Sequence, residues 1–215
     1  MTKNKNFKRL VRQRMEDTGE TYTQARNKLL TIEPEQKKRV KIPLLGQLEE
    51  DKKFDDWLQS DPIFVKMLGG EFSFILEGYT EDEKQDEFHT AIENILGAEE
   101  QVLRAAQEDI FQYYKDVNSN FDPSDEWYLE IPSSDDVWKH IKFGDWLAVK
   151  RRPFGDQLIY IEFECDCDWE AEHVLQIVLK QGLCINKIGP YDGHLTNSDA
   201  YAKKELENVV YRSTQ

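Results

Sequence analysis

Hydrophobic and polar residues alternate without interruption along residues 158–169, which read Leu-Ile-Tyr-Ile-Glu-Phe-Glu-Cys-Asp-Cys-Asp-Trp. A β-strand sends successive side chains to opposite faces, so this period of two predicts a half-buried strand. We expect one face to bury the apolar members and the other face to carry four carboxylates. The apolar members are Ile159, Ile161, Phe163, Cys165, Cys167 and Trp169, and the acidic members are Glu162, Glu164, Asp166 and Asp168.

The four carboxylates need compensation, because neighbours on one face of a strand lie only about 7 Å apart. Three sources of compensating positive charge or solvation are possible. The face could be solvated and paired with cations on neighbouring strands, it could meet a basic macromolecule, or it could bind a divalent cation. The candidate cations on neighbouring strands are Lys150, Arg151, Arg152 and Lys180.

Residues 81–117 carry the clearest helical pattern, with apolar residues at spacings of three, four and seven from Phe88 to Tyr114. Gly97 is expected to divide this region into two helices, since glycine costs about 1 kcal/mol in a helix interior. Thr80 and Glu83 have the spacing of a capping box at its start.

The order of elements is strands, then helices, then an antiparallel meander. This order predicts an α+β fold, in which the helical region 81–117 packs on one face of an antiparallel sheet. Further strands are predicted at 42–51, 54–58, 63–67, 71–78, 127–131, 145–150, 174–179 and 183–188, with a helical turn at 133–141 and a last helix from Thr196 or Asn197 to about Val210.

Charge divides the chain into two parts. Residues 1–41 hold twelve Lys/Arg against five Asp/Glu, a net charge of +7, and residues 42–215 hold sixteen against thirty-seven, a net charge of −21, which together give the −14 of the whole chain. We therefore expect a basic helical appendage at 1–32, a charged linker at 33–41 and an α+β domain at 42–215. The acidic domain is expected to repel nucleic acid.

The appendage reads as a basic amphipathic helix over residues 5–17, followed by a short helix that Thr21 or Thr23 caps. It resembles a module at the termini of many bacterial proteins, Thr-Gly-Glu-x-Tyr-Thr-x-Ala, here residues 18–25. It is also similar to the helical half of a ribbon-helix-helix unit. The resemblance to the ribbon-helix-helix unit implies DNA binding through residues 1–30, and the other interpretation of the helix pair is a docking or dimerising appendage.

Several classes of protein are not expected. No apolar run approaches the length of a membrane span, and no signal peptide is evident, so we expect a cytoplasmic protein. Three cysteines do not make a disulfide framework. The sequence lacks the glycine-rich nucleotide motifs, the Gly-x-Ser-x-Gly motif and the His-Glu-x-x-His motif, so we expect no cofactor.

The end of the central strand collects possible zinc ligands. Cys165, Cys167 and His173 supply thiol and imidazole groups. However, one residue between two cysteines is fewer than structural zinc sites use, and both thiols fall on the apolar face. Buried thiols are therefore expected in place of a metal site.

The same corner carries carboxylates beside a histidine. Asp168, Glu170, Glu172 and His173 could place a general base next to an orienting carboxylate. They could equally form a tight turn in which Asp168 accepts backbone hydrogen bonds. A metal-dependent or hydrolytic enzyme that uses Cys167, Asp168, Glu172 and His173 is therefore one alternative.

The run Cys167-Asp168-Trp169-Glu170-x-Glu172-His173, followed by Leu175–Val178 and Gly182, resembles the motif of an uncharacterised bacterial domain family. That motif reads Cys-Asp-Trp-x-x-Glu-His-Gly-Leu, and the resemblance covers roughly Ile42 to Gly193. This chain has Val174 in place of the glycine and adds Cys165. Members of the family look like proteins of toxin-immunity neighbourhoods, which implies a binding protein.

We therefore expect a non-enzymatic acidic binding protein of the immunity or antitoxin type. Its partner would be a basic protein, which would meet Glu162, Glu164, Asp166 and Asp168. The enzyme at the corner and a DNA-binding regulator acting through residues 1–30 are the alternatives.

Overall fold

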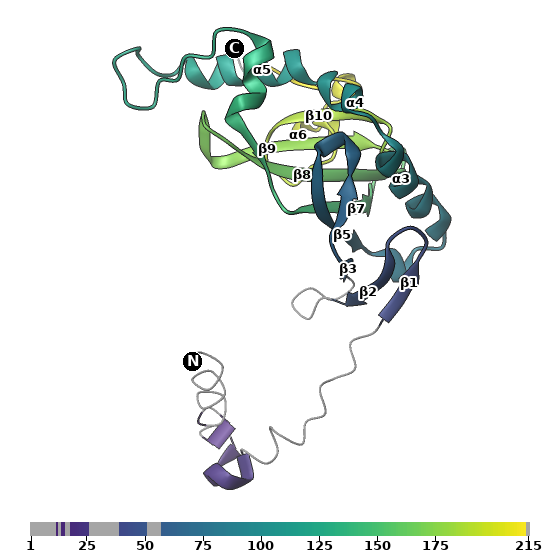
Figure 1. The fold of residues 1–215 in the computed structure, drawn as a ribbon. Helices are drawn as coiled ribbons and strands as arrows, with labels where there is room; N and C mark the ends of the chain where they lie inside the picture. Colours follow the sequence, from purple (N-terminus) through teal and green to yellow (C-terminus); the bar gives the residue numbers. More distant parts are fainter. Residues whose placement is uncertain (1–11, 13, 16–17, 26–38, 51–56, 214–215) are drawn as a thin grey trace. The chain divides into compact units, whose positions relative to one another are not determined.

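The computed structural model divides the chain into two compact units, Met1–Lys38 and Arg39–Gln215 (Figure 1). Within the first unit, Thr21 and Gln24 form a reciprocal cap, which confirms Thr21 as the start of the second helix. Most of residues 1–30 and the expected linker up to Lys38 lie outside the described residues, so the DNA-binding alternative stays a prediction. The structure describes residues 12, 14–15, 18–25, 39–50 and 57–213.

The second unit is built on one twisted sheet, to which ten strands from the described residues contribute. The main strand order is β1-β2-β3-β5-β7-β8-β9-β10, while β4 pairs with β5 and β6 pairs with β8. The strands are β1 (Arg39–Ile42), β2 (Gly46–Glu50), β3 (Trp57–Gln59), β4 (Ile63–Val65), β5 (Gly70–Glu77), β6 (Ile141–Phe143), β7 (Trp146–Arg151), β8 (Ile159–Cys167), β9 (Glu170–Lys180) and β10 (Cys184–Pro190).

All these pairs are antiparallel except β5 with β7, which run parallel because the helical region lies between them in the chain. The helices of that region are α3 (Gln85–Gly97), α4 (Glu100–Arg104) and α5 (Gln107–Asn118). Short helical segments complete the unit: η1 (Lys66–Leu68), η2 (Tyr79–Glu81), η3 (Ser134–His140), α6 (Asn197–Tyr201) and η4 (Lys204–Leu206). The architecture is α+β, with the sheet mostly antiparallel.

One face of the sheet packs against α3, α4 and α5 and forms the main core (Figure 1). The alternation along β8 is confirmed on this face, where its odd-numbered side chains from Ile159 to Cys167 are buried. Each buried side chain of this size contributes about 1.5–3 kcal/mol of transfer free energy. The apolar period therefore fixes which face of β8 meets the helices.

The turn between β9 and β10 comes very close to α3. Gly182 has φ +68°, and a Cβ atom at this position would lie 2.3 Å from the Ala91 carbonyl oxygen. The Asn94 side chain donates a hydrogen bond of 2.9 Å to the Gln181 carbonyl. A glycine is therefore required here by both the backbone conformation and the available space.

Three local expectations are wrong. The Thr80–Glu83 capping box is absent because Thr80 belongs to η2 and α3 begins after Lys84, which makes no side-chain cap. The strand expected at 127–131 is absent, because Trp127 lies in a turn and residues 128–131 pair with no strand among the described residues. Residues 39–41, expected in the linker, form β1 because they pair with β2 and bury the neighbouring Ile42.

The last helix is also shorter than expected. Thr196 caps α6 by accepting a hydrogen bond from the Asp199 amide, but α6 ends at Ala202, where φ is +52°. None of the helices in the described part of the chain has the length and apolar character to cross a membrane.

Candidate functional site

The acidic row of β8 does not form one solvated face. Glu162 is 1% exposed and accepts hydrogen bonds from Lys150 Nζ and from Gln176 Nε2, the latter at 2.6 Å. Glu164 is half-buried, whereas Asp166 and Asp168 are exposed. Of the three sources of compensation, pairing with a cation on a neighbouring strand is present at Glu162, through Lys150, but this carboxylate is buried and not solvated.

Glu162 belongs to a chain of paired polar groups that crosses five strands or strand ends. Lys187 Nζ donates to Gln176 Oε1 and to Asp192 Oδ1, both at 2.6 Å, and Lys150 Nζ lies 3.8 Å from Glu77. Burial lowers the pKa of Lys187 and raises the pKa of Glu77. We call these residues the polar network: Glu77, Lys150, Glu162, Gln176, Lys187 and Asp192.

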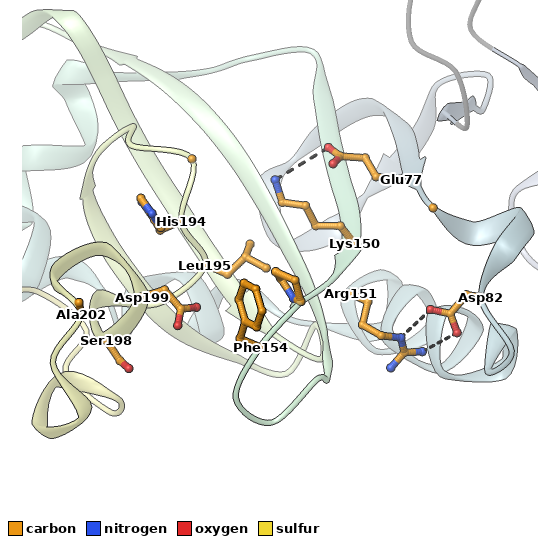
Figure 2. Close-up of a pocket in the computed structure, with 13 residues that line it drawn as sticks. Glu77, Asp82, Lys150, Arg151, Phe154, His194, Leu195, Ser198, Asp199 and Ala202 are labelled. Atoms are coloured by element: carbon orange, nitrogen blue, oxygen red, sulfur yellow. Dashed lines mark hydrogen bonds and ion pairs between the residues drawn. The ribbon is translucent and has the colours of Figure 1, made fainter.

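A cavity of about 770 Å³ lies over the Lys150 end of the network (Figure 2). Figure 2 shows Lys150 pointing to Glu77 and Arg151 turned toward Asp82, so both cations along this wall are engaged by protein carboxylates. Phe154, at the turn between β7 and β8, lines the cavity and is 75% exposed. The charged groups of this cavity mainly pair with one another.

The segment after β10 covers the network's face of the sheet. Leu195 packs on Tyr160 and Val178 in a small second core. The buried Arg152 guanidinium donates to the carboxylates of Asp199 and Glu207 and lowers the pKa of both. This clamp fixes the segment that encloses Glu162 and Lys187.

The end of β8 is a tight hairpin, in which Asp168 and Trp169 form the turn between Cys167 and Glu170. The Asp168 amide donates to the His140 carbonyl, and Asp168 Oδ2 lies 2.9 Å from His140 Nδ1. Asp168 is 65% exposed, so this contact contributes little to stability. The Asp168 carboxylate therefore lies at the surface, where a partner can reach it.

The residues named for the enzyme alternative fall into separate contacts. Burial raises the pKa of Cys167 to about 12, so its thiol is protonated at neutral pH. His173 is exposed, and its Nδ1 lies 3.6 Å from Glu170 Oε1, while Asp168 contacts His140. Across the described residues, no group of three or more His, Cys, Asp or Glu side chains could hold a metal ion.

A large bulge follows the turn. Glu170 and Leu175 of β9 pair with Cys167 and Cys165 of β8. Four residues, 171–174, lie between the first two, whereas one residue, Asp166, lies between the two cysteines. Glu170 Oε1 accepts hydrogen bonds from the amides of Glu172 and His173. Val174 closes the bulge with φ +54°, a conformation that a β-branched residue rarely adopts.

Trp169 ties this hairpin to α5. Its buried ring makes edge contacts with Tyr113 and Tyr114, at centroid distances of 6.2 and 5.9 Å. The Tyr114 hydroxyl donates to the Leu129 carbonyl at 2.7 Å and accepts from the Ile131 amide at 3.0 Å. The same aromatic group therefore supports both the hairpin and the loop that follows α5.

That loop projects at the hairpin end of the sheet (Figure 1). The sequence analysis did not identify it as a candidate binding site. Trp127 in this loop is 68% exposed, and residues 119–130 contain no Lys or Arg. The detectable signal was Asp-Glu-Trp at 125–127, an aromatic residue among acids without a cation. We call the exposed carboxylates of the loop and hairpin the acidic end: Asp122, Asp125, Glu126, Glu130, Asp166, Asp168 and Glu172.

Comparison with known proteins places the chain in a family. No curated protein and no solved structure is significantly similar to it. The family model described as "Domain of unknown function (DUF6985)" matches residues 44–195, which include every strand from β2 to β10 as well as the hairpin, the bulge and the loop. This chain therefore belongs to the DUF6985 family.

Proposed function

We propose that this protein is a non-enzymatic binding protein whose acidic end holds a basic partner protein. An immunity or antitoxin role, with a basic nuclease-like toxin as the partner, is the specific form of this proposal. The observation that carries it is Trp127, an exposed aromatic residue in a loop of carboxylates that contains no cation. Exposed tryptophans are frequent energetic anchors of protein interfaces.

The contact residues differ from the strand face proposed from sequence. Glu162 is enclosed by the polar network, so Asp166 and Asp168 are the acids of β8 and its turn that a partner can reach. Asp166 lies opposite Lys142 of β6, whereas residues 119–130 of the loop contain no Lys or Arg. The loop acids Asp122, Asp125, Glu126 and Glu130 therefore supply most of the attraction.

The loop is held in place before a partner arrives. Tyr114 binds the backbone at Leu129 and Ile131, and the Asn118 side chain accepts a hydrogen bond from the Leu129 amide at 2.9 Å. A loop that is already ordered loses less conformational entropy on binding. Electrostatic attraction to the acidic end would then raise the association rate in a salt-dependent way.

The test is to co-express the full chain with each protein that is encoded beside it and to measure binding by calorimetry over a range of salt concentrations. We expect a basic partner, an affinity that falls as salt rises, and at least a tenfold loss in Trp127→Ala, about 1.4 kcal/mol. Phe154→Ala is the matched control, since Phe154 is also a largely exposed aromatic residue but lines the 770 Å³ cavity and is not part of the acidic end.

Two results would contradict the proposal. One is a partner whose affinity is indifferent to salt. The other is a partner that binds Trp127→Ala as tightly as the unaltered chain.

A further inference from the structure

Another cavity, of about 310 Å³, lies where the motif hairpin meets α5, β10 and the C-terminal residues. Its wall includes Glu170 and His173 of the motif, Lys187 of the polar network, and Tyr113 of α5. Pockets for small ligands are typically about 300–1,000 Å³ in volume. The cavity is therefore large enough for a compact organic molecule.

Tyr113 in this wall has a buried hydroxyl without a partner. The residue is 3% exposed, and its oxygen makes no hydrogen bond within the part of the chain that the structure describes. The two neighbouring tyrosines differ: Tyr114 bonds Leu129, and Tyr211 donates to Asp116 at 2.8 Å. Buried hydroxyls are normally satisfied, so the Tyr113 hydroxyl indicates a missing acceptor.

Both signs of charge line the cavity. Lys187 uses two of its three ammonium hydrogens on Gln176 and Asp192, and the Arg212 guanidinium lies 4.1 Å from the centre of the Tyr201 ring. On the acidic side, Glu170 uses Oε1 for two backbone amides and has a second oxygen. The cavity therefore offers cationic donors for a carboxylate, on Lys187 and Arg212, and a carboxylate acceptor for an ammonium group, on Glu170.

We propose that this cavity binds a small zwitterion of the amino-acid type. The ligand's carboxylate would accept hydrogen bonds from Tyr113 and from the cations Lys187 and Arg212. Its ammonium group would pair with Glu170. A dianion such as phosphate is disfavoured, because Glu170, Asp192 and Asp116 also line the cavity. This site does not depend on the proposed docking of a basic protein.

The test is thermal denaturation and calorimetry of the full chain with each protein amino acid in turn. Amines and carboxylic acids that carry the same side chains serve as probes with one charged group. We expect at least one amino acid to raise the Tm and the matching amine and acid to have no effect. Tyr113→Phe should fold normally, because it removes only an unpartnered hydroxyl, and should bind that amino acid at least tenfold more weakly.

Tyr114→Phe is the matched control, since it removes a hydroxyl that serves the loop and should lower the Tm without changing ligand affinity. Glu170→Gln is a second variant, which should weaken binding of the zwitterion even if Tyr113→Phe does not fold. The proposal is overturned if no amino acid binds, if the acid alone binds as well as the amino acid, or if Tyr113→Phe and Glu170→Gln both retain full affinity.

Discussion

The two ends of the acidic row on β8 follow one sequence pattern and have opposite environments. Glu162, in the middle of the strand, is buried and paired with Lys150 and Gln176. Asp166 and Asp168, at the hairpin end, are exposed. The alternation places all three side chains away from the helices, but it says nothing about what covers them. Residues outside the strand decide which carboxylates are structural and which are free to bind a partner.

The covering residues explain the difference. In the middle of β8, the segment after β10 closes over the sheet through Leu195 and the Arg152 clamp. At the end of β8, the hairpin turns back, Lys142 lies opposite Asp166, and His140 contacts Asp168.

The largest effect is expected from Lys150→Met. This substitution leaves Glu77 and Glu162 without their shared cation, and loss of one partner of a buried pair costs about 3–5 kcal/mol. Lys142→Met is the matched control at the exposed end, where it faces Asp166 and should cost less than about 0.5 kcal/mol. Urea denaturation of both variants at neutral pH makes the comparison, and equal losses would contradict it.

The pH dependence of the Lys150→Met loss has a definite sign. Burial already raises the pKa of Glu77 above its ordinary 4.5, and Lys150 opposes that rise. Without Lys150 the folded-state pKa is higher still, so the folded state takes up protons before the unfolded state does as pH falls. The loss should therefore be greatest near neutral pH and should shrink as the pH falls toward 4.5, the ordinary pKa of a glutamate.

The second prediction concerns the apolar face. Gly182→Ala places a Cβ atom against the Ala91 carbonyl and strains a left-handed residue, so we expect a loss of about 2–4 kcal/mol. Gly97→Ala is the control, because Gly97 ends α3 with open space around it and alanine favours helix by about 1 kcal/mol. The measurement is thermal denaturation. If Gly182→Ala were as stable as the unaltered chain, the close approach of the β9–β10 turn to α3 would be contradicted.

The helix-facing side of the sheet could be predicted from the sequence because apolar periodicity encodes it. The period of two along β8, the helical spacing after residue 84 and the end of α3 at Gly97 are all present in the structure. The parallel pairing of β5 with β7 was missed, because strand pairing across a long helical insertion leaves no local pattern. The sequence also gives no sign that residues 127–131 stay unpaired, because the contacts of this segment come from Tyr114 and Asn118, which lie on α5.

The burial of Glu162 could not be predicted because it depends on three separate strands. Lys187 was the available signal, since it is a charged residue between Ile185 and Ile188 in a short strand. Its significance appears only when Gln176 and Glu162 are placed beside it. The cavity at Tyr113 was missed for the same reason, because α5, the hairpin and the C-terminal residues all contribute to it.

A smaller effect is expected from Val174→Gly. The left-handed conformation of Val174 costs about 1–2 kcal/mol, and glycine removes this strain. Glycine also increases the conformational entropy of the unfolded state, which destabilises the fold by about 0.5–1 kcal/mol. We expect the free energy of unfolding to rise by up to about 1 kcal/mol. Val178→Gly is the contrasting variant, since Val178 is buried in the small core and should lose stability. A clear loss in Val174→Gly would mean that the bulge needs the valine side chain.

The most direct test measures stability and partner binding on the same two variants. Glu162→Gln should lower the free energy of unfolding by about 1–3 kcal/mol and leave the Kd for the basic partner unchanged. Asp166→Asn combined with Asp168→Asn should change stability by less than about 0.5 kcal/mol and weaken binding. The reverse result, in which Glu162→Gln loses affinity at full stability while the paired variant unfolds and still binds, would contradict the division between structural and binding carboxylates.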